Sequence, residues 1–419
     1  MEKQIIKTGA LSVRQIGAVA AGNALEFYDF LTFSFFATQI GNVFFPLQSE
    51  DSRLLLALAT FGVGFLVRPL GGFLIGRMGD IRGRKPAMLL SFGLMGLSIV
   101  GLALTPSYAT IGLAAPILVV MFRLLQGFAL GGEVGPASAF LMEAAPRERR
   151  GFYVALQFST QWLAILAAGI IGLVLANLLT PAALTQWGWR AAFLVGALVV
   201  PFGLFVRRHL PETLPEREET DAVMPSRWSV VLRGLFMLAA GTIATYTLNY
   251  LTTFATHTLG LLPRIAFGAT AMCGLCGLIF TLLGGYMADR LGRKPMMVAS
   301  MTLLTLAAPP CFMAMVAMKT GGALLGASAV MAILLSLAMP AIFISLLENL
   351  PAATRSGGIG TLYALAISVF GGTTQFLVAA LITLTGSPLM PGWYISGAML
   401  VGLIAMAGMR ETAPVKTGG

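Results

Sequence analysis

The sequence predicts an all-α membrane protein with twelve transmembrane helices in two pseudo-symmetric six-helix bundles. Three observations predict it: the composition, the recurrence of long apolar stretches, and a motif that occurs twice. The 419 residues are 57% hydrophobic and only 11% charged, with a mean hydropathy of +0.86, whereas soluble domains carry about 25% charged residues. A soluble fold could not bury so much apolar surface, so most of the chain is expected to lie in lipid.

Apolar stretches recur to the end of the sequence, and most reach the roughly 20 residues that a spanning helix needs. In hydrocarbon, backbone polar groups must be satisfied within the segment, and the alternating pattern of barrel strands is missing, so we expect helices. The first stretch lacks a convincing cleavage site and is interpreted as a retained helix. The predicted helices cover residues 15–38, 54–77, 86–105, 111–142, 152–179, 189–208, 230–256, 264–288, 295–317, 322–348, 358–385 and 392–409.

The basic residues predict the orientation of these helices. Placing the N-terminus in the cytoplasm puts most of the 27 Lys and Arg residues in cytoplasmic loops, as the positive-inside rule requires. Both termini are therefore predicted to be cytoplasmic. The most polar stretch, residues 211–227, is interpreted as a cytoplasmic linker. The predicted organisation is an N-terminal bundle over 1–208, a linker over 209–229 and a C-terminal bundle over 230–419.

Two motifs repeat between these halves at nearly one offset. Residues 76–86 (GRMGDIRGRKP) follow the second predicted helix, and residues 285–295 (GYMADRLGRKP) follow the eighth. A second motif, Glu-x-x-Pro-x-x-x-Arg, occurs at residues 143–150 and again at 348–355. Such a duplicated six-helix unit is typical of transporters whose central site opens alternately to each side of the membrane.

The repeated loop motif resembles the G-x-x-x-D-R-x-G-R-K signature of the major facilitator superfamily, and the resemblance implies that fold. Its Asp can accept charge-assisted hydrogen bonds from Arg and from helix N-termini, which would latch one side closed. The first copy has Ile81 where Arg is usual, so its latch is expected to be weaker or differently wired. Alternatively, the motif only fixes topology. The gating candidates in the two copies are Asp80, Arg84, Asp289, Arg290 and Arg293.

Polar side chains within the predicted helices indicate a site, because a charge at membrane depth costs about 2.5 to 3.5 kcal/mol on insertion scales. Asn23, Glu26 and Asp29 step by three along the first helix and share a face. Arg123 and Gln126 share a face near the middle of the fourth.

Two further charges, Arg68 and Glu133, lie at comparable depth on the second and fourth predicted helices. Their depth is closer to the cytoplasm than that of Arg123. We therefore expect a structural or gating pair rather than a substrate contact.

The N-terminal pattern resembles a narrower group, the metabolite:proton symporters. The resemblance is carried by GNALEFYDF at 22–30 and RPLG at 68–71. RLLQGF at 123–128, GFY at 151–153 and GWR at 188–190 are most similar to the citrate and tricarboxylate branch. The resemblance implies import of a di- or tricarboxylate by proton symport. Symport of 2-oxoglutarate, shikimate or betaine and proline stays open, as does coupling to Na⁺, and a drug or cation exporter is a further alternative.

Within this interpretation, Arg123 is the first candidate to bind a substrate carboxylate, because guanidinium pairs bidentately and stays charged. The alternative role is an internal salt bridge to the first helix. Glu26 and Asp29 are the candidate proton acceptors, since burial and a neighbouring Arg push a carboxyl pKa in opposite directions. The alternative for them is a static buried pair. Substrate and proton displacing an Arg123–carboxylate pair would couple their fluxes.

Uncharged polar groups are expected to complete a central cavity, because amides and phenols can orient a polycarboxylate by hydrogen bonds. Such groups in membrane helices often bond only to each other or to backbone, which is the alternative. His257, near the outer end of the seventh predicted helix, is expected to be a capping or interface group. The substrate-binding candidates beside Arg123 and Gln126 are Asn23, Tyr28, Gln157, Gln161, Tyr246, Asn249, Tyr250, Tyr363 and Gln375.

Several function classes are not favoured. The net charge of +10 falls in short clusters between apolar segments, which argues against nucleic acid. The three cysteines lie in apolar stretches, and neither a metal cluster nor a phosphate-binding loop is visible, so no cofactor, metal or enzymatic activity is expected. We expect a monomeric multi-pass protein of the bacterial inner membrane, with a small organic anion and the lipid bilayer as its partners.

Overall fold

The computed structural model describes residues 24–25, 27–82, 84–131, 142, 145–198, 201, 228–350 and 355–417. Within these ranges the regular structure is helical. The predicted linker lies outside the described residues except for its last two positions, which begin a helix. Side chains are not described at residues 76, 79–85, 87–88 and 355–357.

Helices before residue 202 form the first half of the chain. Residues 27–35 are helical and run into α2. The elements that follow include short turns between the longer helices. The bounds are α2 Ala37–Phe44, α3 Glu50–Leu66, α4 Arg68–Arg82, α5 Arg84–Leu104, α6 Tyr108–Ile111, α7 Ala114–Ala129, η1 Arg147–Arg149, α9 Arg150–Leu178, α10 Pro181–Ala183, η2 Leu184–Gly188 and α11 Trp189–Gly196.

Helices from residue 228 onward form the second half. Two of the long helices contain a single wider turn, η3 after α13 and η5 between α17 and α18, and such π-type turns often occur at functional sites. The bounds are α13 Trp228–Thr253, η3 Phe254–Thr258, α14 Pro263–Leu291, α15 Arg293–Met318, α16 Gly321–Asn349, α17 Arg355–Ala366, η5 Ile367–Gly371, α18 Gly372–Thr385, α19 Met390–Ala407 and α20 Pro414–Thr417.

In the described part of the chain, eight helices are long and apolar enough to cross a membrane. They cover residues 50–75, 147–178, 228–258, 263–291, 293–318, 321–349, 358–385 and 390–407, and each overlaps one of the twelve predicted stretches. Residues 89–104 and 114–129 form shorter apolar helices. The predicted stretches 15–38 and 189–208 lie partly outside the described residues.

Local sequence explains where several of these helices break. The break between α3 and α4 falls at Val67, two residues before Pro69, which cannot donate to the helix ladder. Gly292 separates α14 from α15 with a φ of 109°, a conformation that residues with a Cβ rarely adopt. The side chain of Thr320 accepts the N–H of Ala323 and so caps α16.

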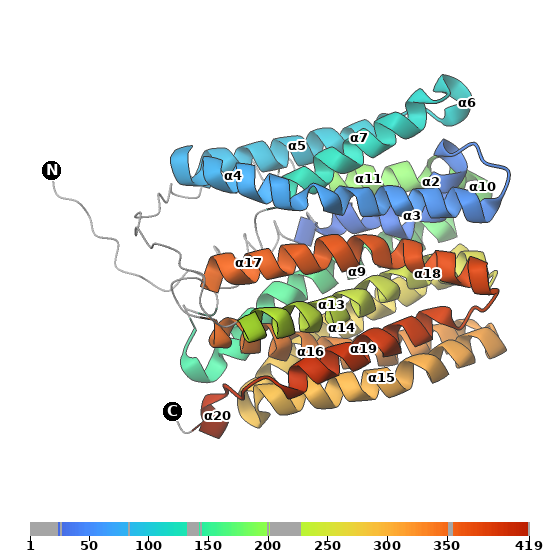
Figure 1. Cartoon of the computed structure of the whole chain (residues 1–419). Helices are drawn as coiled ribbons and strands as arrows, with labels where there is room; N and C mark the ends of the chain where they lie inside the picture. Colours follow the sequence, from blue (N-terminus) through green and yellow to red (C-terminus); the bar gives the residue numbers. More distant parts are fainter. Residues whose placement is uncertain are drawn as a thin grey trace.

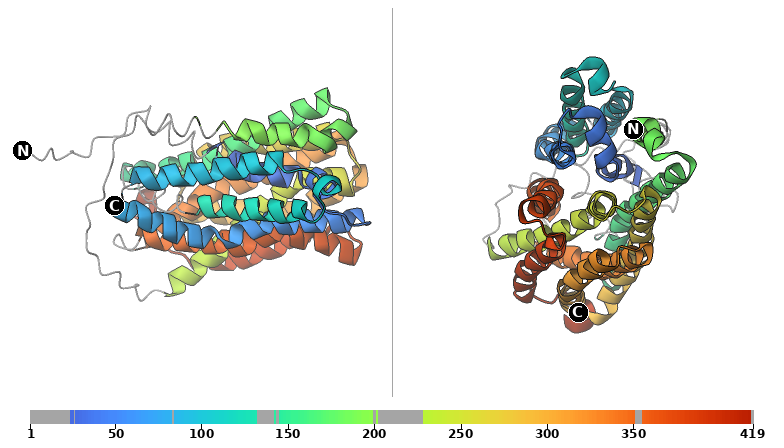
Figure 2. Two further views of the ribbon diagram at one scale, coloured as in Figure 1. Left: turned by 90° about the horizontal axis from the view of Figure 1, so that it is seen from above. Right: turned by 90° about the vertical axis from the view of Figure 1, so that its right-hand side faces the viewer.

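The long helices run roughly side by side, and the two halves group on opposite sides of the bundle (Figures 1 and 2). We call the end that carries α20 the α20 end, and the end that carries α6 the α6 end. Among the described residues, the most extensive packing between the halves is that of α9 along α14 and of α3 along α18. The molecule therefore has a seam between its halves that runs from one end to the other.

Glycines let the first-half helices approach closely. A Cβ on Gly72 would lie 2.6 Å from the carbonyl oxygen of Gly131, and one on Gly127 would overlap the carbonyl of Gly64. These contacts join α4 and α3 to α7, because small residues let membrane helices approach closely. Their close backbone approach fixes the position of Arg123, one turn before Gly127.

Candidate functional site

A small cavity lies on the seam between the halves, among α9, α13, α16, α17 and η5. Its polar lining consists of one amide and four hydroxyl groups, and the rest is apolar or aromatic. Across it, Gln161 of the first half donates from Nε2 to the hydroxyl of Tyr363 of the second, at 3.4 Å. The lining residues are Phe158, Gln161, Trp162, Ile165, Thr242, Thr245, Tyr246, Met339, Tyr363 and Ile367.

Three of the predicted substrate-binding residues line this cavity: Gln161, Tyr246 and Tyr363. Sequence reasoning missed Trp162 and Thr242. Thr242 lies one turn before the predicted residue Tyr246 on the same helix, so a search for polar residues one turn away from Tyr246 would have found it. For Trp162 the signal was the spacing of Phe158, Trp162 and Ile165, which is also the spacing of ordinary core packing.

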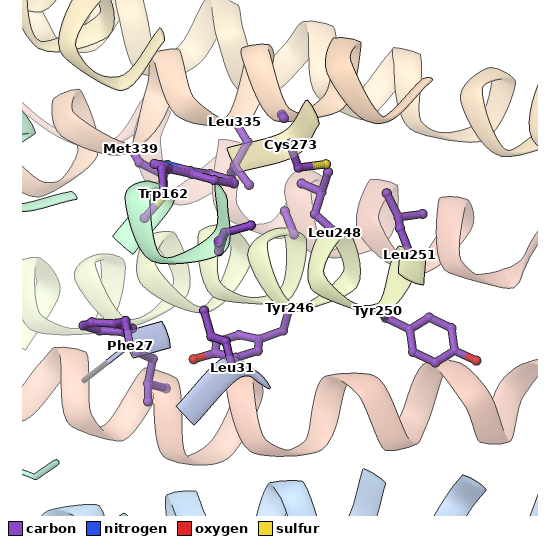
Figure 3. Packing of buried hydrophobic residues seen from close by; sticks show 14 of the residues in the cluster. Phe27, Leu31, Trp162, Tyr246, Leu248, Tyr250, Leu251, Cys273, Leu335 and Met339 are labelled. Atoms are coloured by element: carbon purple, nitrogen blue, oxygen red, sulfur yellow. The ribbon is translucent and has the colours of Figure 1, made fainter. Parts of the chain in front are cut away.

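Aromatic rings separate the cavity from the buried arginines of the first half. The ring of Tyr246 lies 5.3 Å from that of Phe65 and 6.2 Å from that of Phe61. The guanidinium carbon of Arg68 lies 4.5 Å from the Phe65 ring, and that of Arg123 lies 5.0 Å from the Phe61 ring. Figure 3 shows Tyr246 leaving α13 beside Leu31. We call Phe61, Phe65 and Tyr246 the aromatic wall.

Arg123 is fully buried behind this wall, on α7. Its Nη1 donates to the carbonyl of Phe30 at 3.4 Å and to the Oε1 of Gln126, and its Nη2 donates to the carbonyl of Phe61 at 3.3 Å. The guanidinium also stacks 4.3 Å from the ring of Phe30. The predicted substrate arginine therefore does not line the cavity in this conformation, because ring faces and carbonyls surround it.

Gln126 connects Arg123 to Asp29. Its Oε1 accepts from Arg123, while its Nε2 donates to Oδ2 of Asp29. The direct pair between Arg123 and Asp29 that the sequence suggested is thus replaced by a three-residue relay. The carboxylate of Asp29 is fully buried, and its other oxygen, Oδ1, accepts no hydrogen bond from the described residues.

The remaining candidates lie elsewhere. Tyr28 donates its hydroxyl to the carbonyl of Ala192 at 2.8 Å, which ties the first predicted helix to α11 rather than to the cavity. Gln157 and Asn249 are buried outside the cavity lining. Tyr250 lines a second, smaller pocket.

Gln375 also lies outside the lining, but it bridges the halves. It accepts from the hydroxyl of Ser34 at 2.8 Å and donates to the carbonyl of Tyr246 at 3.3 Å. The amide therefore fixes the backbone of a cavity-lining residue against the first predicted helix.

Part of the predicted site cannot be placed. Asn23, Glu26 and Glu133 lie outside the described residues, and Asp80 and Arg84 are described by backbone only. Arg68 is buried, with its guanidinium 4.2 Å from the ring of Phe30. The ring of Phe30 thus packs against the guanidiniums of both Arg68 and Arg123.

The second copy of the loop motif bridges the halves at the α20 end. Asp289 accepts hydrogen bonds from the backbone N–H groups of Gly151 at 2.8 Å and Phe152 at 2.9 Å, at the start of α9. Arg293 lies 3.0 Å from the same carboxylate and 3.4 Å from Glu348. Asp289 and Arg293 are therefore brought together as predicted.

The second repeated motif contributes to the same bridge. Arg150, from its first copy, lies 3.9 Å from Glu348, from its second copy. Arg290, by contrast, packs over Tyr286 at 4.7 Å and is exposed, outside this bridge.

The end of the chain joins this network, which the sequence did not suggest. Glu411 accepts the backbone N–H groups of Arg293 and Lys294 at 3.0 Å each, at the start of α15. Burial alone would raise the pKa of Glu411, but backbone N–H donors, with Ala413 first, outweigh it and lower the pKa. Thr412 donates its hydroxyl to Glu348 at 2.6 Å.

At the α6 end, different contacts join the halves. Nε2 of His257, on η3, lies 3.4 Å from a carboxylate oxygen of Asp51, on α3. The rings of Phe36 and Phe267 pack with centroids 4.8 Å apart. His257 is therefore an interface group, as expected, and both ends of the described seam carry contacts between the halves.

Comparison with known proteins places this geometry in a family. The profile of the Major Facilitator Superfamily matches residues 30–371. A citrate-proton symporter of Klebsiella pneumoniae is 36% identical over 413 residues, covering 96% of this chain and 93% of the relative. An alpha-ketoglutarate permease of Escherichia coli (strain K12) is 32% identical over 390 residues, covering 91% and 89%. A proline/betaine transporter of the same strain is 30% identical and covers 98% and 85%.

Solved structures agree on the fold. A D-xylose-proton symporter superimposes with a TM-score of 0.75 at 19% identity, over 92% of this chain and 96% of the other. The xylose transporter of E. coli in a partially occluded inward-open conformation gives a TM-score of 0.76 at 18% identity, over 95% and 97%. The loop motif, the profile match and the extent of the relatives lead to one conclusion: the protein belongs to the major facilitator superfamily.

Proposed function

We propose that the protein imports a di- or tricarboxylate, citrate or a close relative, together with protons, by alternating access between its two halves. The observation that carries the proposal is the Arg123–Gln126–Asp29 relay next to a cavity that both halves line. The names of the citrate-proton symporters that the chain resembles support the substrate class.

The relay accounts for both substrate and proton. Arg123 is a permanent cation that can offer two parallel N–H groups to a carboxylate. It is held by neutral carbonyls, one amide and ring faces, contacts that an incoming carboxylate can replace. A buried carboxylate oxygen without a partner is costly, and binding a proton removes the charge that makes it so. Asp29 is thus the proton acceptor in this proposal, with Glu26 as the second candidate.

Access requires the aromatic wall to part. A substrate in the cavity meets Gln161, Tyr363 and Tyr246 first, and Phe61 and Phe65 stand between it and the guanidiniums. Rocking of the halves would move Tyr246, which belongs to the second half, away from the two phenylalanines of the first. The substrate carboxylate then reaches Arg68 and Arg123 only in a state where the seam has shifted, which links binding to the conformational cycle.

The topology completes the proposal. The protein would be a monomer of the bacterial inner membrane, with twelve helices in bundles over 1–208 and 230–419 and a cytoplasmic linker between them. In this topology the α20 end faces the cytoplasm. Asp289, Glu348 and Glu411 then latch the cytoplasmic side, while His257 and Asp51 close the outer side. Asp80, Arg84 and the pair of Arg68 with Glu133 are proposed to serve the same gates.

The experiment is transport in proteoliposomes with labelled citrate. Asp29→Asn should abolish proton-driven accumulation but retain counterflow exchange, because binding survives while coupling is lost. Arg123→Ala should abolish both. Glu50→Gln, an exposed acid on α3, is the matched control for loss of a carboxylate. Equal accumulation by wild type and Asp29→Asn would reject the coupling role.

A second candidate substrate is 2-oxoglutarate, favoured by the 32% identity to the permease and by a cavity whose described lining is neutral and small. A ligand-induced thermal shift across citrate, 2-oxoglutarate, shikimate and betaine separates these. Repeating uptake with an imposed Na⁺ gradient in place of the proton gradient tests the alternative coupling ion.

A further inference from the structure

A glycine that does not line the cavity packs directly behind a residue that does. Trp162 on α9 is the largest side chain of the cavity lining, and it is 5% exposed. Behind it stands Gly277 of α14, in the opposite half: a Cβ there would overlap Cδ2 and Cε3 of the indole and would lie 2.6 Å from its Cγ. Ordinary contacts begin near 3.4 Å. The indole therefore occupies the space that any other residue at position 277 would fill.

Helices α9 and α14 cannot separate to make room for a side chain at position 277. A Cβ on Gly169 would lie 2.7 Å from the Cα of Ala271, and one on Gly274 would lie 2.5 Å from the Cα of Leu166. Both of these backbone approaches follow Trp162 along α9. A third precedes it, because a Cβ on Gly285 would lie 2.6 Å from the carbonyl oxygen of Gly151, and the three hold α9 and α14 together. Because tightly packed helices resist local separation, a methyl group at position 277 must displace the indole.

The open side of the indole is the cavity. Trp162 shares the lining with Met339 and Phe158, and Figure 3 shows the indole lying beside Met339. A flat, rigid ring has few rotamers with which to avoid a clash, in contrast to an unbranched methionine. The displaced ring would move into the space where a ligand binds.

We propose that Gly277 is a specificity-determining positioning residue: by seating Trp162 against α14, it sets the largest carboxylate that the cavity accepts. The kind of ligand in this inference rests on the proposed function. The position of the Trp162 indole against Gly277 follows from the packing of these two residues alone. The glycine touches no ligand and acts only through the indole.

The same geometry gives an internal comparison. A Cβ on Gly241 of α13 would lie 2.6 Å from the sulfur of Met339, another lining residue. Met339 is flexible, so it can yield with little loss of cavity width. Gly241→Ala should therefore affect large ligands less than Gly277→Ala does.

The test measures the binding of citrate and of the smaller succinate to purified protein by isothermal titration calorimetry. Gly277→Ala should weaken citrate binding at least about tenfold, since one methylene-sized change in a tight pocket is worth about 10- to 200-fold. Succinate binding should change by less than about threefold. Gly268→Ala is the matched control on the same helix, where a Cβ would meet one atom of Leu325 at 3.9 Å, and both affinities should stay as in wild type.

A double variant distinguishes an effect that acts through the Trp162 indole from a general effect on helix packing. In a Trp162→Ala background the methyl group has no indole to displace, so Gly277→Ala should leave the ratio of the two affinities unchanged. Trp162→Phe places a smaller ring against the unchanged Gly277, so it should shift the ratio of the two affinities toward citrate. This variant keeps the test decisive if Gly277→Ala does not fold.

Equal weakening of both ligands by Gly277→Ala, or a full effect in the Trp162→Ala background, would overturn the inference. Binding of neither carboxylate by the wild-type protein counts against the proposed function instead. The two failures are therefore distinguishable.

Discussion

Asp289 accepts the backbone N–H of Gly151 at 2.8 Å across the boundary between the two halves. The carboxylate sits at the N-terminus of a 29-residue helix, where unpaired N–H groups and the helix dipole favour a negative charge. Arg293 approaches the same carboxylate at 3.0 Å from its own helix bundle. Sliding α9 past α14 must break the two backbone bonds, and we therefore propose that this contact is a latch at the α20 end.

Removing the charge of Asp289 should open that latch. Asp289→Asn weakens two hydrogen bonds to a charged acceptor, each contributing about 1.5–3 kcal/mol, so the fraction of molecules open at the α20 end should rise at least about tenfold. Electron spin resonance distances between labels at Glu148 and Leu291, one in each half, measure the opening. A distance distribution identical to that of the parent protein would show that Asp289 is not a latch.

Loss of Asp51 should raise the fraction of molecules that are open at the α6 end. Asp51→Asn removes the partner of His257, and because Asp51 is half exposed, the effect should be about 1 kcal/mol or less. Labels at Leu47 and Leu384, which are exposed in opposite halves, should report a modest increase in the open fraction at this end. His257→Gln should give the same increase in the open fraction. The double variant should give an increase no larger than that of either single variant. Additive effects would mean that the two residues act separately.

Glu411 should make stability at the α20 end depend on pH. Its pKa in the folded protein is lowered from 4.5, so its stabilising contribution is complete above that value and is lost as the pH falls through the lower folded pKa. At pH 7, Glu411→Gln should lower the melting temperature by about 2 °C. The difference between variant and wild type should disappear once the pH has fallen through that lowered pKa, and a difference that persists in acid would assign the effect to packing rather than charge.

Tyr363 should contribute to affinity through its hydroxyl. Tyr363→Phe removes the acceptor of Gln161 and one polar group of the cavity. Citrate affinity should fall by about five- to tenfold, as expected for one neutral hydrogen bond. Tyr394→Phe on α19, outside the cavity lining, is the matched control and should bind as the parent does. Calorimetric titration of purified protein provides the measurement, and equal affinities for the Tyr363→Phe variant and the parent would remove this residue from the site.

Much of the fold could be predicted because lipid imposes simple rules. Spanning length and apolarity located all eight long apolar helices in the described part of the chain, since a helix of about 20 apolar residues has few other stable environments. The repeated loop motif located Asp289 and Arg293 because a carboxylate before a helix start is a local signal.

The candidate site was predicted only in part, because periodicity shows which residues share a helix face but not what covers that face. Arg123 was correctly placed within a helix, and its neighbour Gln126 lies on the same helix face, yet the three Phe rings that surround it belong to segments far away in sequence. Tyr28 meets Ala192 across 164 positions. Glu411 lies in a polar tail whose target, the start of α15, is more than 100 residues earlier. Such contacts depend on tertiary packing.

Coupling of substrate to protons is the central claim, and internal pH during downhill uptake tests it most directly. Proteoliposomes with a trapped pH-sensitive dye receive external citrate with no imposed proton or sodium gradient. The account predicts that citrate entry acidifies the lumen with wild-type protein, and that Asp29→Asn admits citrate with little acidification. Citrate entry through the wild-type protein at constant internal pH, or entry that requires Na⁺, would contradict it.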